Sequence, residues 1–368
     1  MGAESTNGGS PDSEAERTAL QRWLEAHLPG AKRVTVVQFE RPKSGYSAET
    51  LVFDAVVEGD GTAQPSGERT ERFVLRKEVP DPAVYPQQAP GLDVEIDIQY
   101  RVMAAVAAHD AVPVAPLVGY EGDREVLGTP FFVMRHVAGE VPTESPPYTE
   151  TGFFVDASPD ERRRMIEAGV RTLAAFHTID WRAAGLDWLV PPGVEPGTRR
   201  QLELWEQYAR RELAGREHPL LDDAFRWLHA NLPADTSLTL CWGDPRPGNI
   251  IWRDFAPVCL TDFEAAAIAT PEQDLGWWLM FDRTMHPTGE RLPGDPTRDE
   301  QRDLYAAITG RDLRDIAYHE VFAAARYSAI VVRVMNRLVD RGQLPPEQTI
   351  WLQNPASACL AELLEEHA

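Results

Sequence analysis

The sequence predicts an α+β protein with two lobes, a β-rich N-terminal lobe with one main helix and a mainly helical C-terminal lobe. Three observations support this. Apolar residues make up 43% of the 368 residues, enough for a sizeable core. Short runs rich in Val, Phe and Leu dominate the chain up to Ala138-Gly139. Beyond Gly139 the apolar residues follow helical spacing.

The N-terminal lobe is expected over residues 15–138, after a polar tail, residues 1–14, that we expect to be disordered and that lacks the apolar core of a signal peptide. A short amphipathic helix is expected over Ala15–His27, ended by Pro29-Gly30. Gly59–Arg69 is typical of a solvated hairpin loop. The remaining elements have the order β-β-β-α-β-β and are expected over Arg33–Phe39, Thr50–Val57, Arg72–Lys77, Leu92–His109, Ala115–Tyr120 and Pro130–Val137.

The C-terminal lobe, residues 139–368, begins its helices at a capping box. Ser158-Pro159-Asp160-Glu161 places Ser at the N-cap, Pro at the first helical position and Glu three residues after the cap, and it predicts a helix to about Asp180. Further helices are expected over Thr198–Ala214, Pro219–Asn231, Thr297–Thr309, Arg314–Arg341 and Glu347–Glu366. Three short apolar strands are expected over Leu238–Trp242, Asn249–Trp252 and Val258–Asp262.

The net charge of −22 argues against a nucleic-acid partner, because phosphate backbones require a basic surface. An acidic surface suits a cationic substrate, although it is also a common route to solubility, which we favour. The three cysteines form no CxxC pair, which indicates a reducing compartment. No apolar run approaches the ~18 residues of a membrane span. We therefore expect a cytoplasmic protein without a membrane partner.

The residues with the clearest chemistry lie between Trp242 and Glu264. Asp244 and Asn249 are five residues apart in a Pro/Gly-rich loop between two apolar strands, and Asp262 ends a third strand. Phosphoryl transfer needs such a set. One Asp accepts or orients the proton of the attacking hydroxyl, while an Asn oxygen and a second carboxylate are hard ligands for the Mg²⁺ that bridges the ATP phosphates. Each Asp alone is more typical of a turn; the ordered set favours a catalytic centre.

The segments GDPRPGNIIW and LTDFEAAAIATPEQDLGW resemble the aminoglycoside-phosphotransferase family, a protein-kinase-like group with an H-G-D-x-H-x-x-N loop and a D-[WF]-E. The resemblance covers most of the chain from about Thr35. It implies a protein-kinase-like bilobal fold, ATP and Mg²⁺ as cofactors, Asp244 as the catalytic Asp, and Asn249 and Asp262 as metal ligands. It also implies that Asp274 braces the catalytic loop; a plain helix N-cap is the alternative.

Two residues depart from the family pattern. Trp242 stands where the family usually has His, so any proton or hydrogen-bond role of that His must be absent or supplied by another group. Arg246 stands where a second His is common. It is expected either near the γ-phosphate as a fixed cation or facing outward from the loop.

The resemblance also implies nucleotide contacts in the N-terminal lobe. Backbone and hydroxyl groups of Ser44, Gly45 and Ser47 are expected at the phosphates. Arg76 is expected to hold the phosphates, with Lys77 facing solvent. Gln99 falls at the position of its helical partner, and Glu95, one turn earlier, is expected at the surface. Backbone groups from Met134 to His136 are expected to contact adenine, with His136 a hinge residue, while His177 is expected to be structural.

We therefore predict an enzyme that transfers the γ-phosphoryl group of ATP to an alcohol group of a small molecule, such as an aminoglycoside or another amino or hydroxy compound. The resembled family includes kinases of antibiotics, choline-type compounds, sugars and amino acids, and domains that act on hydroxyacyl thioesters. Aromatic residues that include Trp277 and Phe281 line either the acceptor pocket or the core, and the core is favoured. The alternative is a catalytically idle nucleotide-binding module that serves as a sensor or binds a partner. A P-loop NTPase is excluded because the chain has no GxxxxGK[ST].

Overall fold

The computed structural model describes residues 14–40, 48–59, 67–92, 94–235 and 237–367. The polar tail up to residue 13, most of the expected hairpin loop, and Ser44, Gly45 and Ser47 lie outside the described residues. The chain divides into two compact units. The sheet unit comprises Met1–Pro82, Val94–Tyr100 and Ala115–His136, and the helical unit comprises Ala83–Asp93, Arg101–Val114 and Val137–Ala368.

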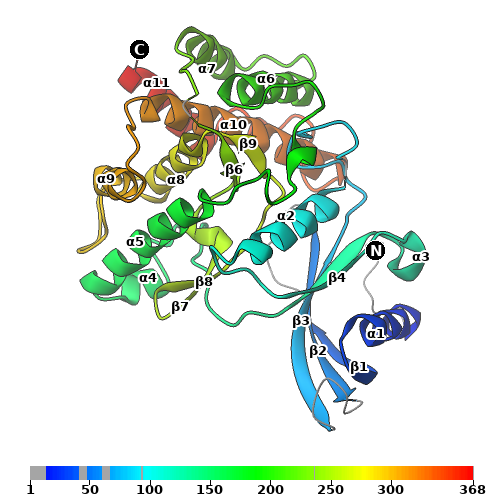
Figure 1. Cartoon of the computed structure of the whole chain (residues 1–368). Coiled ribbons are helices and arrows are strands. Elements are labelled where there is room, and N and C mark those ends of the chain that lie inside the picture. The colour runs from blue at the N-terminus through cyan, green and yellow to red at the C-terminus, as the bar shows by residue number, and fades with distance from the viewer. Residues whose placement is uncertain (1–13, 41–47, 60–66, 93, 236, 368) are drawn as a thin grey trace, which may run out of the picture. The chain divides into compact units, whose positions relative to one another are not determined.

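The sheet unit contains a five-stranded antiparallel sheet with the strand order β1-β2-β3-β5-β4 (Figure 1). The expected strands are all present, and the register of β2 against β3 runs without a shift from Glu49↔Lys77 to Glu58↔Glu68. Among the described residues, three helices begin in this unit, at Glu14, Glu95 and Arg124. The bounds are β1 (Ala31–Glu40), β2 (Glu49–Gly59), β3 (Glu68–Lys77), α2 (Glu95–His109), β4 (Leu117–Glu121), α3 (Arg124–Leu127) and β5 (Phe131–Arg135).

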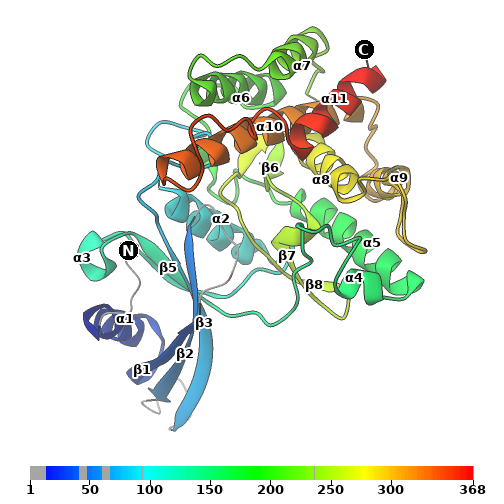
Figure 2. The same ribbon diagram turned by 180° about the vertical axis from the view of Figure 1, so that it is seen from behind.

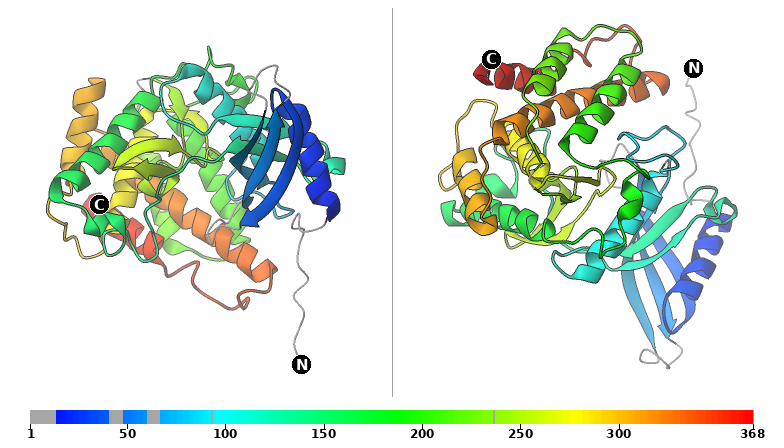
Figure 3. Two further views of the ribbon diagram at one scale, coloured as in Figure 1. Left: turned by 90° about the horizontal axis from the view of Figure 1, so that it is seen from below. Right: turned by 45° about the horizontal axis from the view of Figure 1, so that its top comes forward.

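Helix α1 (Glu14–His27) lies along one face of this sheet and closes its core (Figure 3). Leu20 and Leu24 of α1 are buried together with Phe53 of β2 and Leu75 of β3, because alternate strand residues point to the same face. Lys77 follows Leu75 by two residues and is buried on that face, near carboxylates of α1 and β2. The expectation that Lys77 faces solvent was therefore wrong: the helix covers the face on which it lies.

The helical unit is organised around the long helix α10, which packs against α6, α7, α8 and α11 (Figure 2). Two two-stranded antiparallel sheets, β6 with β9 and the hairpin of β7 with β8, accompany the helices. The bounds are α4 (Phe153–Asp156), α5 (Pro159–Phe176), α6 (Thr198–Leu213), α7 (Pro219–Ala230), β6 (Thr239–Cys241), β7 (Ile250–Arg253), β8 (Ala256–Leu260), β9 (Ala267–Ala269), α8 (Pro271–Met285), α9 (Arg298–Thr309), α10 (Ile316–Asp340) and α11 (Pro355–His367).

Local signals located most of these helices. The capping box at Ser158 is formed, with both of its reciprocal hydrogen bonds, but α5 ends at Phe176, four residues before the expected end. Helix α11 begins at Pro355 and not at Glu347, because Pro favours the first helical position and disfavours helix in the residue before it. Within the described part of the chain, no helix is both long enough and apolar enough to cross a membrane.

Candidate functional site

The carboxylate of Asp244 lies at the centre of a hydrogen-bond cluster in the loop between β6 and β7, and the residue is 3% exposed. The described residues supply four donors to it. Trp277 Nε1 (2.7 Å) and Arg246 Nε (2.9 Å) donate to Oδ1. Asn249 Nδ2 (2.9 Å) and the hydroxyl of Tyr85 (3.1 Å) donate to Oδ2. A carboxylate held by four donors has one fixed orientation, which is what positioning a reacting hydroxyl requires.

Asn249 and Asp262 are brought together by the main chain. The Asn249 carbonyl accepts hydrogen bonds from both the backbone N–H (2.9 Å) and the hydroxyl (3.0 Å) of Thr261, the residue before Asp262. The Asn249 amide nitrogen donates to Asp244, so its side-chain oxygen points the other way and is available as a ligand. An amide oxygen beside a carboxylate is a donor set that fits Mg²⁺.

Trp242 supplies a hydrogen bond that joins the Asp244 loop to the Asp262 turn. Its indole Nε1 donates to the carbonyl of Thr261 (2.8 Å) and to that of Asp262 (3.1 Å), and its ring is buried. Asp262 itself has a φ of 57°, in the left-handed region that is unfavourable for most side chains. Trp242 cannot titrate, but as a donor it stabilises the turn that presents Asp262.

Asp274 braces the Asp244 loop from α8. Its carboxylate accepts the backbone N–H of Trp242 (2.6 Å) and of Gly243 (3.0 Å), and it contacts Nε2 of His177 (3.1 Å). The N-cap of α8 is Thr270, four residues earlier, so the alternative role of Asp274 as the helix cap is wrong. Gly243 has a φ of 92°, and a Cβ there would lie 2.0 Å from the Ala265 carbonyl oxygen, so only glycine fits.

His177 is structural, as expected. Its Nδ1 contacts the hydroxyl of Tyr305 at 2.6 Å, and its Nε2 contacts Asp274. His177, Cys241 and Asp274 lie close enough together for a metal site. Each of them is already engaged, however, since the Cys241 thiol donates to the Thr270 carbonyl (3.3 Å) and burial raises its pKa well above the usual value. The three residues therefore form a brace under the loop.

Arg246 faces inward, so the outward-facing alternative is wrong. Its guanidinium pairs with Asp244 and with Glu144, and it lies over the ring of Phe281 at 4.9 Å. Burial alone would lower the pKa of Arg246, but the two carboxylates raise it, so the group stays charged. Burial raises the pKa of Glu144, while Arg246 opposes that shift and Asp244 adds to it.

Sequence reasoning did not single out Tyr85 or Arg326. Burial raises the pKa of Tyr85 well above its usual value, and the Asp244 carboxylate adds to the shift, so the phenol keeps its proton. Arg326 of α10 is buried; it donates to the Gly243 carbonyl (2.7 Å), and its guanidinium lies over the rings of Trp205 (4.8 Å) and Trp277 (4.7 Å). Sequence signals would have been weak, because Tyr85 is 159 residues from Asp244.

The expected nucleotide residues that the structure describes lie in the sheet unit. Arg76 is half-buried on β3, opposite Phe132 of β5. Gln99 is buried on α2, and so is Glu95 one turn before it. The expectation that Glu95 is a surface residue was wrong, because the face of α2 that carries both side chains is buried.

The expected adenine-binding backbone lies at the end of β5. Met134 pairs with Val74 in the sheet, and the backbone N–H of His136 donates to the Arg72 carbonyl (2.9 Å). Burial lowers the pKa of the His136 imidazole, and the nearby Arg72 charge acts in the same direction. Because this N–H is engaged within the sheet, an adenine contact here would use other backbone groups of the segment.

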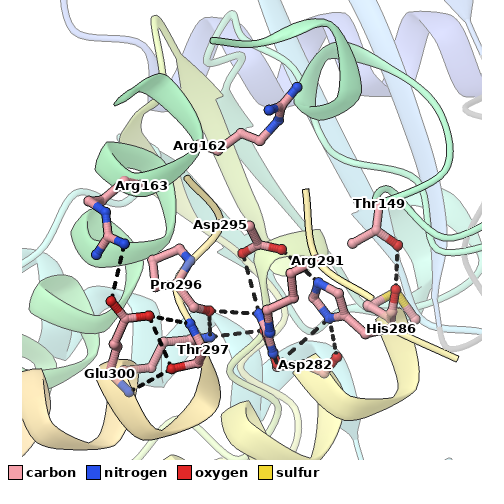
Figure 4. A network of polar contacts seen from close by, with 12 residues as sticks. Thr149, Arg162, Arg163, Asp282, His286, Arg291, Asp295, Pro296, Thr297 and Glu300 are labelled. Carbon is pink, nitrogen blue, oxygen red and sulfur yellow. Dashed lines mark hydrogen bonds and ion pairs between the residues drawn. The ribbon is translucent and has the colours of Figure 1, made fainter. Parts of the chain in front are cut away.

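A cavity of about 670 Å³ in the helical unit contains none of the candidate residues. Its lining includes Arg283, Arg291 and Arg298, and each of these pairs with a carboxylate. Beside it, His286 contacts Asp295 at 2.6 Å, and Arg291 joins Asp282 to the same cluster (Figure 4). Burial opposes the charged imidazole, but Asp295 and Asp282 outweigh it and raise the pKa of His286. The cluster is an internally paired structural network.

Comparison with known sequences identifies the family. The sequence profile of the phosphotransferase enzyme family matches residues 60–317. Acyl-CoA dehydrogenase family member 11 of Homo sapiens is 28% identical over 278 residues, which cover 74% of this chain and 32% of that relative. The chain therefore spans about a third of the length of that relative.

Comparison with solved structures gives the fold. A candidate aminoglycoside phosphotransferase from Ralstonia eutropha JMP134 is similar with a TM-score of 0.68 and 24% identity, over 95% of this chain and 98% of its own. The GDP complex of aminoglycoside 2'-phosphotransferase-IIIa is similar with a TM-score of 0.57 and 13% identity, over 97% of this chain and 100% of its own. The expected protein-kinase-like α+β fold is thereby confirmed.

Proposed function

We propose, since the chain belongs to the phosphotransferase enzyme family, that it transfers the γ-phosphoryl group of ATP to a hydroxyl of a small molecule. The single observation that carries the proposal is the cluster around Asp244. Asp244 is fixed by four donors, and Asn249, one of these donors, is also tied to the residue before Asp262. A hydrogen bond thus joins the side chains of Asp244 and Asn249, and the main chain of Asn249 is tied to the residue before Asp262, so two of the three oxygen-bearing side chains that phosphoryl transfer needs are in contact and the third follows the tied residue.

In this proposal Asp244 orients the acceptor hydroxyl and takes its proton. The side-chain oxygen of Asn249 and the carboxylate of Asp262 would hold Mg²⁺, which when bound neutralises charge on the ATP phosphates. Asp274 and the indole of Trp242 hold the two segments that carry these groups. Arg246 is the fixed cation of the site and limits the repulsion between Asp244 and Glu144.

The acceptor class is proposed from the site and the relatives together. Arg246 and Glu144 place both signs of charge beside Asp244, so the site suits a polar acceptor with groups that pair with either. Solved structures with this fold include an aminoglycoside phosphotransferase, and the human relative is named as a member of the acyl-CoA dehydrogenase family. Amino alcohols, aminoglycosides and hydroxyacyl-CoA compounds are therefore the acceptors to test first.

The test is a screen for ADP release from Mg²⁺-ATP with aminoglycosides, macrolides, amino alcohols, sugars and hydroxyacyl-CoA compounds as acceptors. We expect at least one class to raise ADP release above the rate with water alone, with a phosphorylated product detected by mass spectrometry. ATP binding without acceptor-dependent ADP release from any class would instead support the idle nucleotide-binding module.

A further inference from the structure

Tyr85 makes the hydrogen bond that an acceptor hydroxyl is proposed to make. Its phenolic O–H donates to Oδ2 of Asp244 at 3.1 Å. The same oxygen accepts from Asn249, a proposed metal ligand, at 2.9 Å. The charges of Asp244, Glu264 and Asp262 all act on the Tyr85 hydroxyl. A hydroxyl that belongs to the chain therefore lies among the groups proposed to carry out phosphoryl transfer.

The backbone just before Tyr85 is held within the helical unit. The carbonyl of Ala83 accepts from Arg333 of α10 (3.1 Å), and the carbonyl of Val84 accepts from the hydroxyl of Tyr208 of α6. Val84 is buried, while Tyr85 is half-buried. Because the segment is held from two helices, the Tyr85 hydroxyl is placed by the fold and not by chance contact of an exposed side chain.

The lone pairs of Asp244 leave no further position for an acceptor. A carboxylate accepts about four hydrogen bonds, and the described residues already supply four donors. Trp277 and Asn249 are buried, and Arg246 is also held by Glu144. The bond from Tyr85 is the longest of the four, so Tyr85 is the donor that an external acceptor most readily replaces.

We propose that Tyr85 is an internal phosphoryl acceptor of this site. With Mg²⁺-ATP bound and no external acceptor, the phenolic oxygen forms a bond to the γ-phosphorus, the bond from that phosphorus to the β,γ-bridging oxygen breaks, and ADP leaves. The phenolic proton passes to Asp244. The products are ADP and phosphotyrosine, so atoms and charge balance without another reactant. The inference rests on the proposed phosphotransferase function.

The modification has a consequence for activity. A phosphate on Tyr85 adds roughly −1.5 to −2 charges beside the Asp244 carboxylate and occupies the acceptor position. Like charges at that distance repel, and the phosphorylated chain is expected to lose acceptor turnover. An external acceptor replaces Tyr85 as the hydroxyl that donates to Asp244, and so protects the chain from this self-inactivation.

The experiment incubates the full chain with Mg²⁺ and γ-³²P-labelled ATP without an acceptor and locates the label by peptide mass spectrometry. We expect up to one phosphate per chain, on Tyr85, and none in Tyr85→Phe or Asp244→Asn. Tyr318→Phe is the matched control, since Tyr318 is a buried tyrosine whose hydroxyl has no hydrogen-bond partner among the described residues. It should be labelled as the wild type is.

The wild-type measurement does not depend on any variant folding. If Tyr85 carries no label in a chain that phosphorylates an external acceptor, the internal-acceptor proposal is overturned while the proposed function stands. Label on another residue, or label on Tyr85 that persists in a folded Asp244→Asn, also overturns it. A chain that neither labels itself nor releases ADP with any acceptor overturns the proposed function, and this inference with it.

Discussion

Replacing Trp242 by Phe removes one hydrogen-bond donor from the junction between the Asp244 loop and the Asp262 turn. In the wild type the indole N–H is shared between the carbonyl of Thr261 (2.8 Å) and that of Asp262 (3.1 Å). Phe cannot donate, so these carbonyls lose their donor in a buried environment. The turn at Asp262, whose φ is 57°, also loses the contact that holds it.

The magnitude follows from the burial of the indole. An unsatisfied buried polar group costs about 1–3 kcal/mol, and the smaller ring adds a cavity term of similar size. We expect the free energy of unfolding of Trp242→Phe to fall by about 2–4 kcal/mol. If displacement of Asp262 weakens the binding of Mg²⁺-nucleotide by about 1.4 kcal/mol of that loss, the Kd for Mg²⁺-nucleotide rises about tenfold.

The assay is calorimetric titration with a non-hydrolysable ATP analogue and Mg²⁺, together with chemical denaturation. Trp242→His restores an N–H donor, so it should recover nucleotide affinity more than stability. Trp278→Phe is the matched control, because Trp278 is equally buried and its indole donates to Gln301 (2.7 Å), outside the loop. It should lose stability but keep the wild-type Kd. Unchanged affinity in a folded Trp242→Phe, or an equal loss in Trp278→Phe, would refute the reasoning.

Three further predictions concern the helices around the site. Gly276→Ala places a methyl 2.5 Å from the backbone carbonyl carbon of His319, so α8 must shift away from α10. Chemical denaturation should show that the free energy of unfolding falls by about 1–3 kcal/mol, and an unchanged value would contradict the close packing of the two helices. Arg326→Lys loses the guanidinium contacts with the two indole rings and weakens the bond to Gly243. We expect lower kcat and lower Tm, and wild-type values for both would exclude this role. The pKa of His286 is raised in the folded state, so the stability that the charged imidazole contributes is complete below about pH 6.5 and is lost as pH rises through the folded pKa. The Tm difference between wild type and His286→Gln should therefore be larger at pH 5.5 than at pH 8.5. An equal difference at the two pH values would contradict this prediction.

Local pattern was sufficient for much of the fold. Runs rich in Val, Phe and Leu located β1 to β5, a capping box located the start of α5, and helical spacing of apolar residues located α6 and α7. Helix α8 gave no such signal. It is buried on nearly every side over Pro271–Asp282, so it lacks the polar face that marks a helix, and the sequence indicated it only through Asp274 and the family resemblance.

The candidate site was predictable in its residues but not in their partners. The spacing selected Asp244, Asn249 and Asp262; Asp244 and Asn249 share a hydrogen bond, and Asn249 bonds the residue before Asp262. The partners of these residues come from tertiary contacts. Glu144, which pairs with Arg246 from 102 residues away, and Tyr85 reach the loop by chain topology, which no local pattern encodes. Lys77 was misplaced for the same reason, since a helix from elsewhere in the chain covers its face of the sheet.

The most direct test of the central proposal is acceptor-dependent ADP release by Asp244→Asn beside the wild type, with the best acceptor from the screen and with Mg²⁺-nucleotide Kd measured on both. An Asn side chain keeps the size of Asp but cannot take the acceptor proton. We expect acceptor-dependent turnover to fall by about 10²–10⁴-fold, the usual contribution of a general base, while the nucleotide Kd stays within about threefold because under 1 kcal/mol of binding is affected. Turnover equal to that of the wild type would contradict the assignment of Asp244 and the proposed mechanism.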